Sequence, residues 1–390
     1  MTHAVNQRHE NQSASDSKFG TMPGIVLQYR GPNVQHHCGH QNATWTELAK
    51  KLAFLKGYDF AGQYDPAQQY AGRLYFVPTE TLVGVDAARK LGICSEEDLF
   101  GGIVPFPFVA TKTITHPLVD SDAFAPEGWS YDFSRRVQDA VLFGFTAFTL
   151  RDARRAGALV LERGVARVKP ARGVGGQGQT VVSQIAELDA ALETIDAVEL
   201  SRDGIVIEQN FEDITTYSIG QVRVSDLVAT YCGTQRQTTD NEAADVYGGS
   251  DLVVVRGDYE TLLDLDLAPE LRLAIKQART YDIAASQEFP GLMASRRNYD
   301  VAQVVDAGGQ RRLGVLEQSW RIGGASAAEL SALEAFRAEP TLRAVRASCR
   351  EVYGPKETPP PQAVVYFHGV DDGVGPIIKY TVVEPYGNRQ

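Results

Sequence analysis

The sequence predicts an α/β (α+β) protein built from several lobes. The apolar run Gly24–Tyr29 is followed by a polar loop and a helical stretch, which is the pattern of a first α/β unit. Residues 165–208 show the succession strand, glycine loop, strand, helix, strand within a short length of chain. Residues 215–390 alternate apolar runs of strand length with one long helical stretch. A small β-α lobe between two larger parts is therefore expected.

An N-terminal α/β domain is expected at residues 22–150, after a polar arm at 1–21. Thr44-Trp-Thr-Glu47 has the spacing of a capping box, which predicts a helix through about Leu55. The other expected elements are strands at 24–29 and 73–77, helices at 81–91 and 133–143, and a turn-rich crossover at 100–108.

The small lobe is expected at residues 151–214. Thr149 and Asp152 have the spacing of a helix start, and apolar residues at helical spacing predict another helix at 185–198. Strands are predicted at 165–169, 179–182 and 204–208.

The C-terminal lobe, residues 215–390, is expected to be a mainly antiparallel sheet. One helix is predicted from Pro269, a residue favoured in the first turn, to about Ala285. The strands are expected at 217–224, 227–232, 252–255, 299–305 and 313–316, with a hairpin-like stretch at 363–383.

Composition disfavours several classes of protein. The 390 residues are 43% hydrophobic and 22% charged, which suits a globular chain with a sizeable core. A formal net charge of −11 disfavours a nucleic-acid surface but allows a local cationic cleft. The four cysteines form no CxxC pair, no apolar run is long enough to span a membrane, and the N-terminus has no signal-peptide core. A cytoplasmic protein with small-molecule partners is expected.

A glycine-rich loop after Lys169 is the first candidate ligand site. Its backbone N–H groups can approach an anion closely, and Lys169 and Arg172 add positive charge. No Gly-Lys-Ser/Thr follows, and a strand follows where a dinucleotide fingerprint needs a helix. An ordinary hairpin turn is the alternative. The glycines are Gly173, Gly175, Gly176 and Gly178.

Two further segments place acids at strand ends or within strands. The apolar strand 204–208 ends at Glu208, where its backbone groups can pair with an adenine edge or simply end an ordinary strand. Asp300 and Glu317 lie in neighbouring apolar strands, where carboxylates are costly unless they are paired or bind a cation. A salt bridge of Glu317 with Arg296 or Arg297 is the alternative to a metal site.

In this order the motifs resemble those of the ATP-grasp enzymes, over roughly residues 145–326. These enzymes have a lysine before a flexible glycine loop, a hinge strand ending in Glu, an Asp on a later strand and a Glu-x-Asn-x-Arg motif. The matching positions are Lys169, Gly173–Gly178, Glu208, Asp300 and Glu317-Gln-Ser319-Trp-Arg321.

The resemblance implies an ATP-dependent ligase with ATP between the small lobe, which would be its lid, and the C-terminal lobe. A carboxylate would become an acylphosphate that an amine or thiol attacks, while the glycine loop excludes water. Asp300, Glu317 and Ser319 would hold one or two Mg²⁺, and Arg321 and Ser319 would act on the reacting groups. The implied ATP-binding residues are Lys169, Arg172, Gly173, Gly175, Gly176, Gly178, Glu208, Gln209, Phe211 and Lys112.

The sequence departs from the family pattern at two positions. Ser319 stands where the family has Asn, and a hydroxyl is a weaker metal ligand, so the number of Mg²⁺ ions stays open. Thr215 stands where the family has a ribose-binding acid. These departures motivate a second hypothesis, an ATP-binding regulatory protein with reduced catalysis. A biotin-carboxylase-like or phosphotransfer enzyme on the same fold is a third.

The sequence leaves the roles of several residues open. The additional phosphate lysine is assigned to Lys112, with Arg135 and Arg136 as alternatives. A loop rich in His and Cys is more simply a polar or substrate-facing loop than a metal site, because its residues crowd one segment. Its residues are His36, His37, Cys38 and His40. Whether the chain forms a homodimer is also open.

Overall fold

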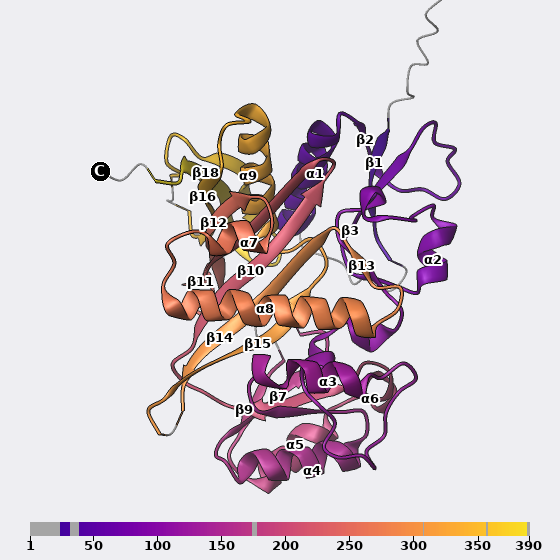
Figure 1. Ribbon diagram of the computed structural model, residues 1–390, viewed down its shortest axis with the longest axis vertical. Coiled ribbons are helices and arrows are strands. Elements are labelled where there is room, and N and C mark those ends of the chain that lie inside the picture. The colour runs from indigo at the N-terminus through magenta and orange to yellow at the C-terminus, as the bar shows by residue number, and fades with distance from the viewer. Residues whose placement is uncertain (1–23, 32–38, 174–177, 307, 356–357, 388–390) are drawn as a thin grey trace, which may run out of the picture.

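The computed structural model describes residues 24–31, 39–173, 178–306, 308–355 and 358–387 (Figure 1). The expected arm at 1–21 lies outside these ranges, as do Gly175, Gly176, His36, His37 and Cys38. None of the helices in the described ranges has the length and apolar content needed to cross a bilayer.

The N-terminal part contains a three-stranded parallel sheet in the order β2-β1-β3. Helix α1 (Gly39–Lys56) connects β1 (Ile25–Tyr29) to β2 (Asp59–Gln63), and β3 (Leu74–Pro78) completes the sheet. The capping box predicted at Thr44 is wrong, because Thr44 Oγ1 lies inside α1 and donates to the carbonyl of His40, 2.8 Å away. The helix therefore begins earlier than the local pattern indicates.

Shorter elements connect the three-stranded sheet to the other lobes. A second small sheet has the order β13-β5-β4. Its strands and the neighbouring helices and 3-10 turns are β4 (Leu82–Val83), α2 (Val85–Lys90), η1 (Glu96–Asp98), β5 (Gly102–Val104), η2 (Pro107–Ala110), η3 (Lys112–Thr115), α3 (Tyr131–Val137), η4 (Gln138–Ala140) and β13 (Met293–Ala294).

The small lobe is a four-stranded sheet in the order β6-β9-β7-β8 with helices against it. Thr149 caps α4, as predicted, by accepting from the Asp152 backbone N–H. The sheet includes β6, which precedes residue 151. The elements are β6 (Gly144–Ala147), α4 (Leu150–Leu161), β7 (Ala166–Pro170), β8 (Thr180–Val182), α5 (Ile185–Glu193), α6 (Ala197–Asp203) and β9 (Ile205–Gln209).

The C-terminal lobe is an eight-stranded antiparallel sheet in the order β15-β14-β10-β11-β12-β16-β18-β17. Its strands are β10 (Thr215–Val224), β11 (Leu227–Thr239), β12 (Asp245–Arg256), β14 (Arg296–Val305), β15 (Arg311–Ser319), β16 (Ala344–Tyr353), β17 (Val364–Asp371) and β18 (Gly375–Pro385). Its helices are α7 (Tyr259–Leu263), α8 (Pro269–Glu288) and α9 (Ser326–Ala338).

Helices cover both faces of the large sheet. Helix α8 packs in one apolar cluster with Ile219, Tyr299 and Val301, whereas α9 and α1 pack in another with Val222 and Val254. Figure 1 shows α8 across the sheet, α9 near α1, and the small lobe below α8. The predicted α/β class, with an N-terminal α/β part, a small β-α lobe and an antiparallel C-terminal sheet, is confirmed.

Candidate functional site

Asp300 and Glu317 form the acidic part of the candidate site. They are register partners on β14 and β15, and a bulge follows Asp300 in the ladder. Gln235 of β11 donates from Nε2 to Asp300 Oδ1 at 2.7 Å. Both carboxylates are partly buried, so like charges face each other where solvent screens them poorly.

The pKa of Asp300 reflects this crowding. Burial, and then the neighbouring Glu317 charge, raise it to about 7, although the hydrogen bond from Gln235 opposes the shift. An acid pair that resists double ionisation fits a hard cation, because a cation would relieve the repulsion. The oxygens of Asp300 and Glu317 would therefore suit a hard cation such as Mg²⁺.

Lys112 supplies a cation to the acid pair in this structure. It lies on η3 and is 6% exposed, with Nζ 2.7 Å from Glu317 Oε2. The same Nζ donates to the carbonyl of Gly173, 2.7 Å away, at the start of the glycine loop. Lys112 thus joins the large sheet to the small lobe, and Glu317 does not pair with Arg296 or Arg297.

Lys169 and Glu208 form a second buried charge pair inside the small lobe. Lys169 Nζ lies 2.5 Å from Glu208 Oε1, and the two residues are 7% and 4% exposed. His116 Nε2 lies 3.1 Å from Glu208 Oε2. Burial alone would raise the pKa of Glu208, but the Lys169 charge and the contacts with His116 outweigh it and lower the pKa to about 2.

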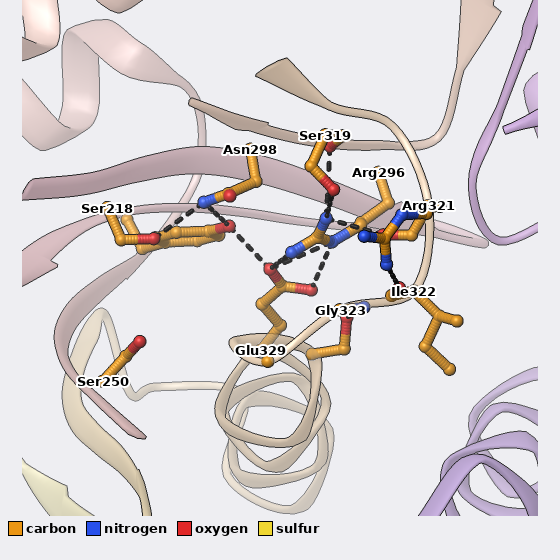
Figure 2. Close-up of polar contacts among 12 residues, drawn as sticks. Ser218, Ser250, Arg296, Asn298, Ser319, Arg321, Ile322, Gly323 and Glu329 are labelled. Atoms are coloured by element: carbon orange, nitrogen blue, oxygen red, sulfur yellow. Dashed lines mark hydrogen bonds and ion pairs between the residues drawn. The ribbon is translucent and has the colours of Figure 1, made fainter. Parts of the chain in front are cut away.

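Ser319 is the last residue of β15, and Arg321 lies two residues beyond it; both adjoin a buried ion pair (Figure 2). Arg296 Nη2 lies 2.8 Å from Glu329 Oε1, and Arg296 Nε donates to both Glu329 oxygens. Arg296 Nη1 donates to Ser319 Oγ at 3.2 Å and to the carbonyl of Arg321 at 2.6 Å. The side chain of Arg321 is 22% exposed, and its Nε lies 3.5 Å from Glu80 Oε2 beyond β3.

Other predicted residues lie away from these contacts or use only their backbone. Arg172 directs its guanidinium to Asp203, with Nε 2.8 Å from Oδ2, so the two make a two-bond salt bridge. Gly178 adopts φ of +71°, a conformation that favours glycine. Gln209 donates its backbone N–H to Phe143, and Phe211 is half-buried just beyond β9.

The alternatives to Lys112 lie elsewhere. Arg135 and Arg136 are on α3, where Arg135 pairs with Asp132 and Arg136 Nε lies 2.7 Å from Glu288 Oε1. Of these three residues, Lys112 is the one that contacts both Glu317 and the start of the glycine loop, and its role towards phosphate stays a prediction.

His40 is the one member of the His/Cys loop within the described residues. It is 3% exposed in α1, and burial, followed by the Lys379 charge, lowers its pKa to about 4. Across the part of the chain that the structure describes, no group of three or more His, Cys, Asp or Glu residues is arranged to hold a metal ion. The loop's role stays a hypothesis.

Sequence reasoning missed two parts of this arrangement. His116 lies four positions after Lys112 and reaches Glu208 through the packing of η3 against the small lobe. Glu329 is fully buried on α9, and a carboxylate within the small and apolar run from Ala327 to Leu333 was the available signal.

The chain belongs to the family described as "Protein of unknown function (DUF3182)", whose sequence profile matches residues 28–381. Comparison with curated protein sequences gave no match.

Solved structures resemble the chain at low identity. An N5-carboxyaminoimidazole synthetase from Staphylococcus aureus, complexed with ADP, is 12% identical, and the alignment covers 94% of this chain and 95% of that chain at a TM-score of 0.49. A biotin carboxylase–β-γ-ATP complex from Campylobacter jejuni is 12% identical. The alignment covers 93% of this chain and 87% of that chain, at a TM-score of 0.47. A D-alanine–D-alanine ligase from Bacillus anthracis is also 12% identical. Here the alignment covers 77% of this chain and 88% of that chain, at a TM-score of 0.43. At these scores, the roles of this chain's residues have to be argued from its own contacts.

The Asp300→Asn variant is expected to be more stable than the wild type above pH 7, by roughly 1–2 kcal/mol. The raised pKa of Asp300 means that the folded state holds a proton that the unfolded state releases, so this residue's contribution to stability falls as the pH rises from about 4 to about 7. Urea unfolding at pH 8 and pH 4.5 measures the difference. The control is Asp306→Asn, because the pKa of Asp306 is shifted in the opposite direction. Hydrogen bonds, first the one from the Gln310 backbone, lower it. An equal effect of Asp300→Asn at both pH values would contradict the assignment.

The Glu208→Gln variant is expected to lose about 3 kcal/mol of stability at pH 7, because Lys169 keeps its charge in a buried place without its anion. The lowered pKa of Glu208 makes its contribution complete above about pH 5, and protonation removes it as the pH falls towards 2. Urea unfolding at pH 7 and pH 3 checks the size and the sign. Glu187→Gln, at an exposed carboxylate bonded to Ser183, serves as the control and should change stability far less.

Proposed function

We propose that this protein is an ATP-dependent ligase of the ATP-grasp type, which activates a carboxylate as an acylphosphate for attack by an amine or a thiol. One observation carries the proposal. Lys112 Nζ lies 2.7 Å from both Glu317 Oε2 and the Gly173 carbonyl, so a cation occupies the point where the acid pair meets the glycine loop. A polyphosphate with its counter-cation matches these charges.

The lysines have donors left for phosphate oxygens. An ammonium group has three N–H donors, of which Lys169 uses one on Glu208 and Lys112 uses two on Glu317 and Gly173. In the proposed complex, Lys112 and Lys169 bind phosphate oxygens of ATP and hold the nucleotide between the lobes. Asp300 and Glu317 would hold Mg²⁺, which neutralises β- and γ-phosphate charge when bound.

The proposed reaction transfers the γ-phosphoryl group to a substrate carboxylate. A carboxylate oxygen forms the new P–O bond, and the bond to the β-phosphate bridging oxygen breaks, so ADP leaves. The amine or thiol then attacks the acyl carbon and releases a proton to solvent, and phosphate leaves with the C–O bond electrons. The guanidinium of Arg321, 22% exposed, is the group that would hold the carboxylate and the developing charge.

A nucleotide-binding regulatory protein without turnover is the second candidate. The engagement of Ser319 Oγ by Arg296 favours it, since it leaves the position with less capacity to bind a metal. Incubation with Mg-ATP and pools of carboxylates, amines and thiols, followed by assay of ADP and phosphate, separates the two candidates. Release of ADP and phosphate that requires both a carboxylate and a nucleophile supports the ligase. Tight ATP binding without release in any mixture supports the regulatory protein.

The Lys169→Ala variant is expected to bind ATP about tenfold more weakly, because a charged hydrogen bond to phosphate is lost. Isothermal titration calorimetry measures the affinity. Lys276→Ala, at an exposed lysine on α8, is the control and should bind as the wild type does. Unchanged affinity in Lys169→Ala would remove this lysine from the phosphate site.

The Glu317→Gln variant is expected to abolish turnover while the protein stays folded, since one of the two carboxylates that fit the cation is neutralised. ADP release reports turnover, and circular dichroism reports folding. Glu260→Gln, at an exposed glutamate that pairs with Arg279, is the matched control. Full activity in Glu317→Gln would refute the metal assignment.

A further inference from the structure

The hydroxyl of Ser319 faces a cationic donor that is built into the fold. Arg296 Nη1 donates to Ser319 Oγ at 3.2 Å and to the Ser319 carbonyl at 3.1 Å, and Figure 2 shows the hydroxyl pointing toward the guanidinium. Arg296 is 1% exposed, so the donor of this contact is shielded from solvent, whereas Ser319 is half-buried. The serine thus has a partner in place before any ligand arrives.

The guanidinium of Arg296 has little freedom to turn away. Its Nε and Nη2 donate to Glu329, which is fully buried on α9, and Glu329 Oε1 also accepts from Tyr231 at 2.6 Å. Asn298 Nδ2 donates to the Tyr231 hydroxyl at 3.1 Å and to Ser218 Oγ at 2.7 Å, which extends the network to β10. Leaving any of these buried groups without a partner would be costly.

The chemistry of a hydroxyl turns this contact into a constraint. A serine hydroxyl has one hydrogen to donate and two lone pairs to accept with. Arg296 takes one lone pair, and a metal ion on the same oxygen would lie next to a guanidinium, where like charges repel. The hydroxyl hydrogen has no acceptor among the hydrogen bonds of the described residues. The group is thus prepared to donate.

We propose that Ser319 donates a hydrogen bond to a phosphoryl oxygen of the bound ligand and is not a ligand of a metal ion. This role rests on the proposed function for the identity of the ligand as ATP. Arg321 lies two positions further along, and its partly exposed guanidinium provides a second donor near the same end of β15. Metal binding is then left to Asp300 and Glu317, which face each other on β14 and β15.

The test separates the affinity for phosphate from the affinity for metal. Ser319→Ala removes the hydroxyl, Ser319→Thr keeps it, and Ser331→Ala is the matched control, at a buried serine of α9 that bonds Tyr366 and Thr381. Calorimetry with inorganic pyrophosphate and with ATP, both in EDTA, measures phosphate affinity without metal. Electron paramagnetic resonance of Mn²⁺ at saturating ATP measures metal affinity.

Ser319→Ala is expected to bind both phosphate probes about tenfold more weakly, with Mn²⁺ affinity within about twofold of the wild type. Ser319→Thr should recover most of the loss, and Ser331→Ala should match the wild type. Unchanged phosphate affinity in Ser319→Ala, or a Mn²⁺ affinity that falls about tenfold, would overturn the proposal while leaving ATP binding in place.

The outcomes also distinguish this proposal from the proposed function. If the wild type binds pyrophosphate but not ATP, and Ser319→Ala weakens that binding, the proposed function fails and the role of Ser319 stands. If the wild type binds neither probe, both are refuted.

Discussion

The buried ion pair between Arg296 and Glu329 is the interaction on which the candidate site depends. Both side chains are at most 1% exposed, so neither charge can be left alone without a cost of several kcal/mol. Arg296 begins β14, Glu329 lies on α9, and the remaining donors of Arg296 hold the chain between Ser319 and Arg321. The pair therefore fixes α9 against the sheet and sets the position in which β15 ends. Gly220 makes room for this, because a Cβ there would lie 2.3 Å from the Tyr231 hydroxyl that bonds Glu329.

Charge pairs also connect the parts of the molecule around that end of the sheet. Lys112 joins Glu317 to the Gly173 carbonyl, and Glu80 approaches Arg321. Glu96 of η1 lies 2.7 Å from Arg297, so a further contact ties the N-terminal part to β14. These contacts join segments far apart in the sequence, and removing one partner of such a pair leaves the other charge partly buried without compensation.

The features that sequence could predict are those governed by local chemistry. The cap at Thr149 and most strands of the large sheet depend on a few neighbouring residues, and they appear as expected. The helix expected at 185–198 divides because Asp196 caps a second helix by accepting from two backbone N–H groups. Local sequence patterns could not predict the ion-pair partners of Glu317 and Arg296. Tertiary packing brings Lys112 to Glu317 and Glu329 to Arg296. Motif order could therefore indicate which acids meet, but not which cations balance them.

The cations of the candidate site are already balanced by acids, and this has a thermodynamic consequence within the proposed function. Lys112 is paired with Glu317, Lys169 with Glu208, and Arg321 with Glu80. A phosphate ligand must therefore share these cations with the protein's own carboxylates. A divalent cation at Asp300 and Glu317 would compensate the charge that Lys112 now offsets, which would leave the ammonium group free for phosphate. Metal and nucleotide would then favour each other's binding, and linkage requires the coupling to be equal in both directions. A chain with a net charge of −11 can in this way bind a polyanion although its cations are paired with acids when no ligand is bound.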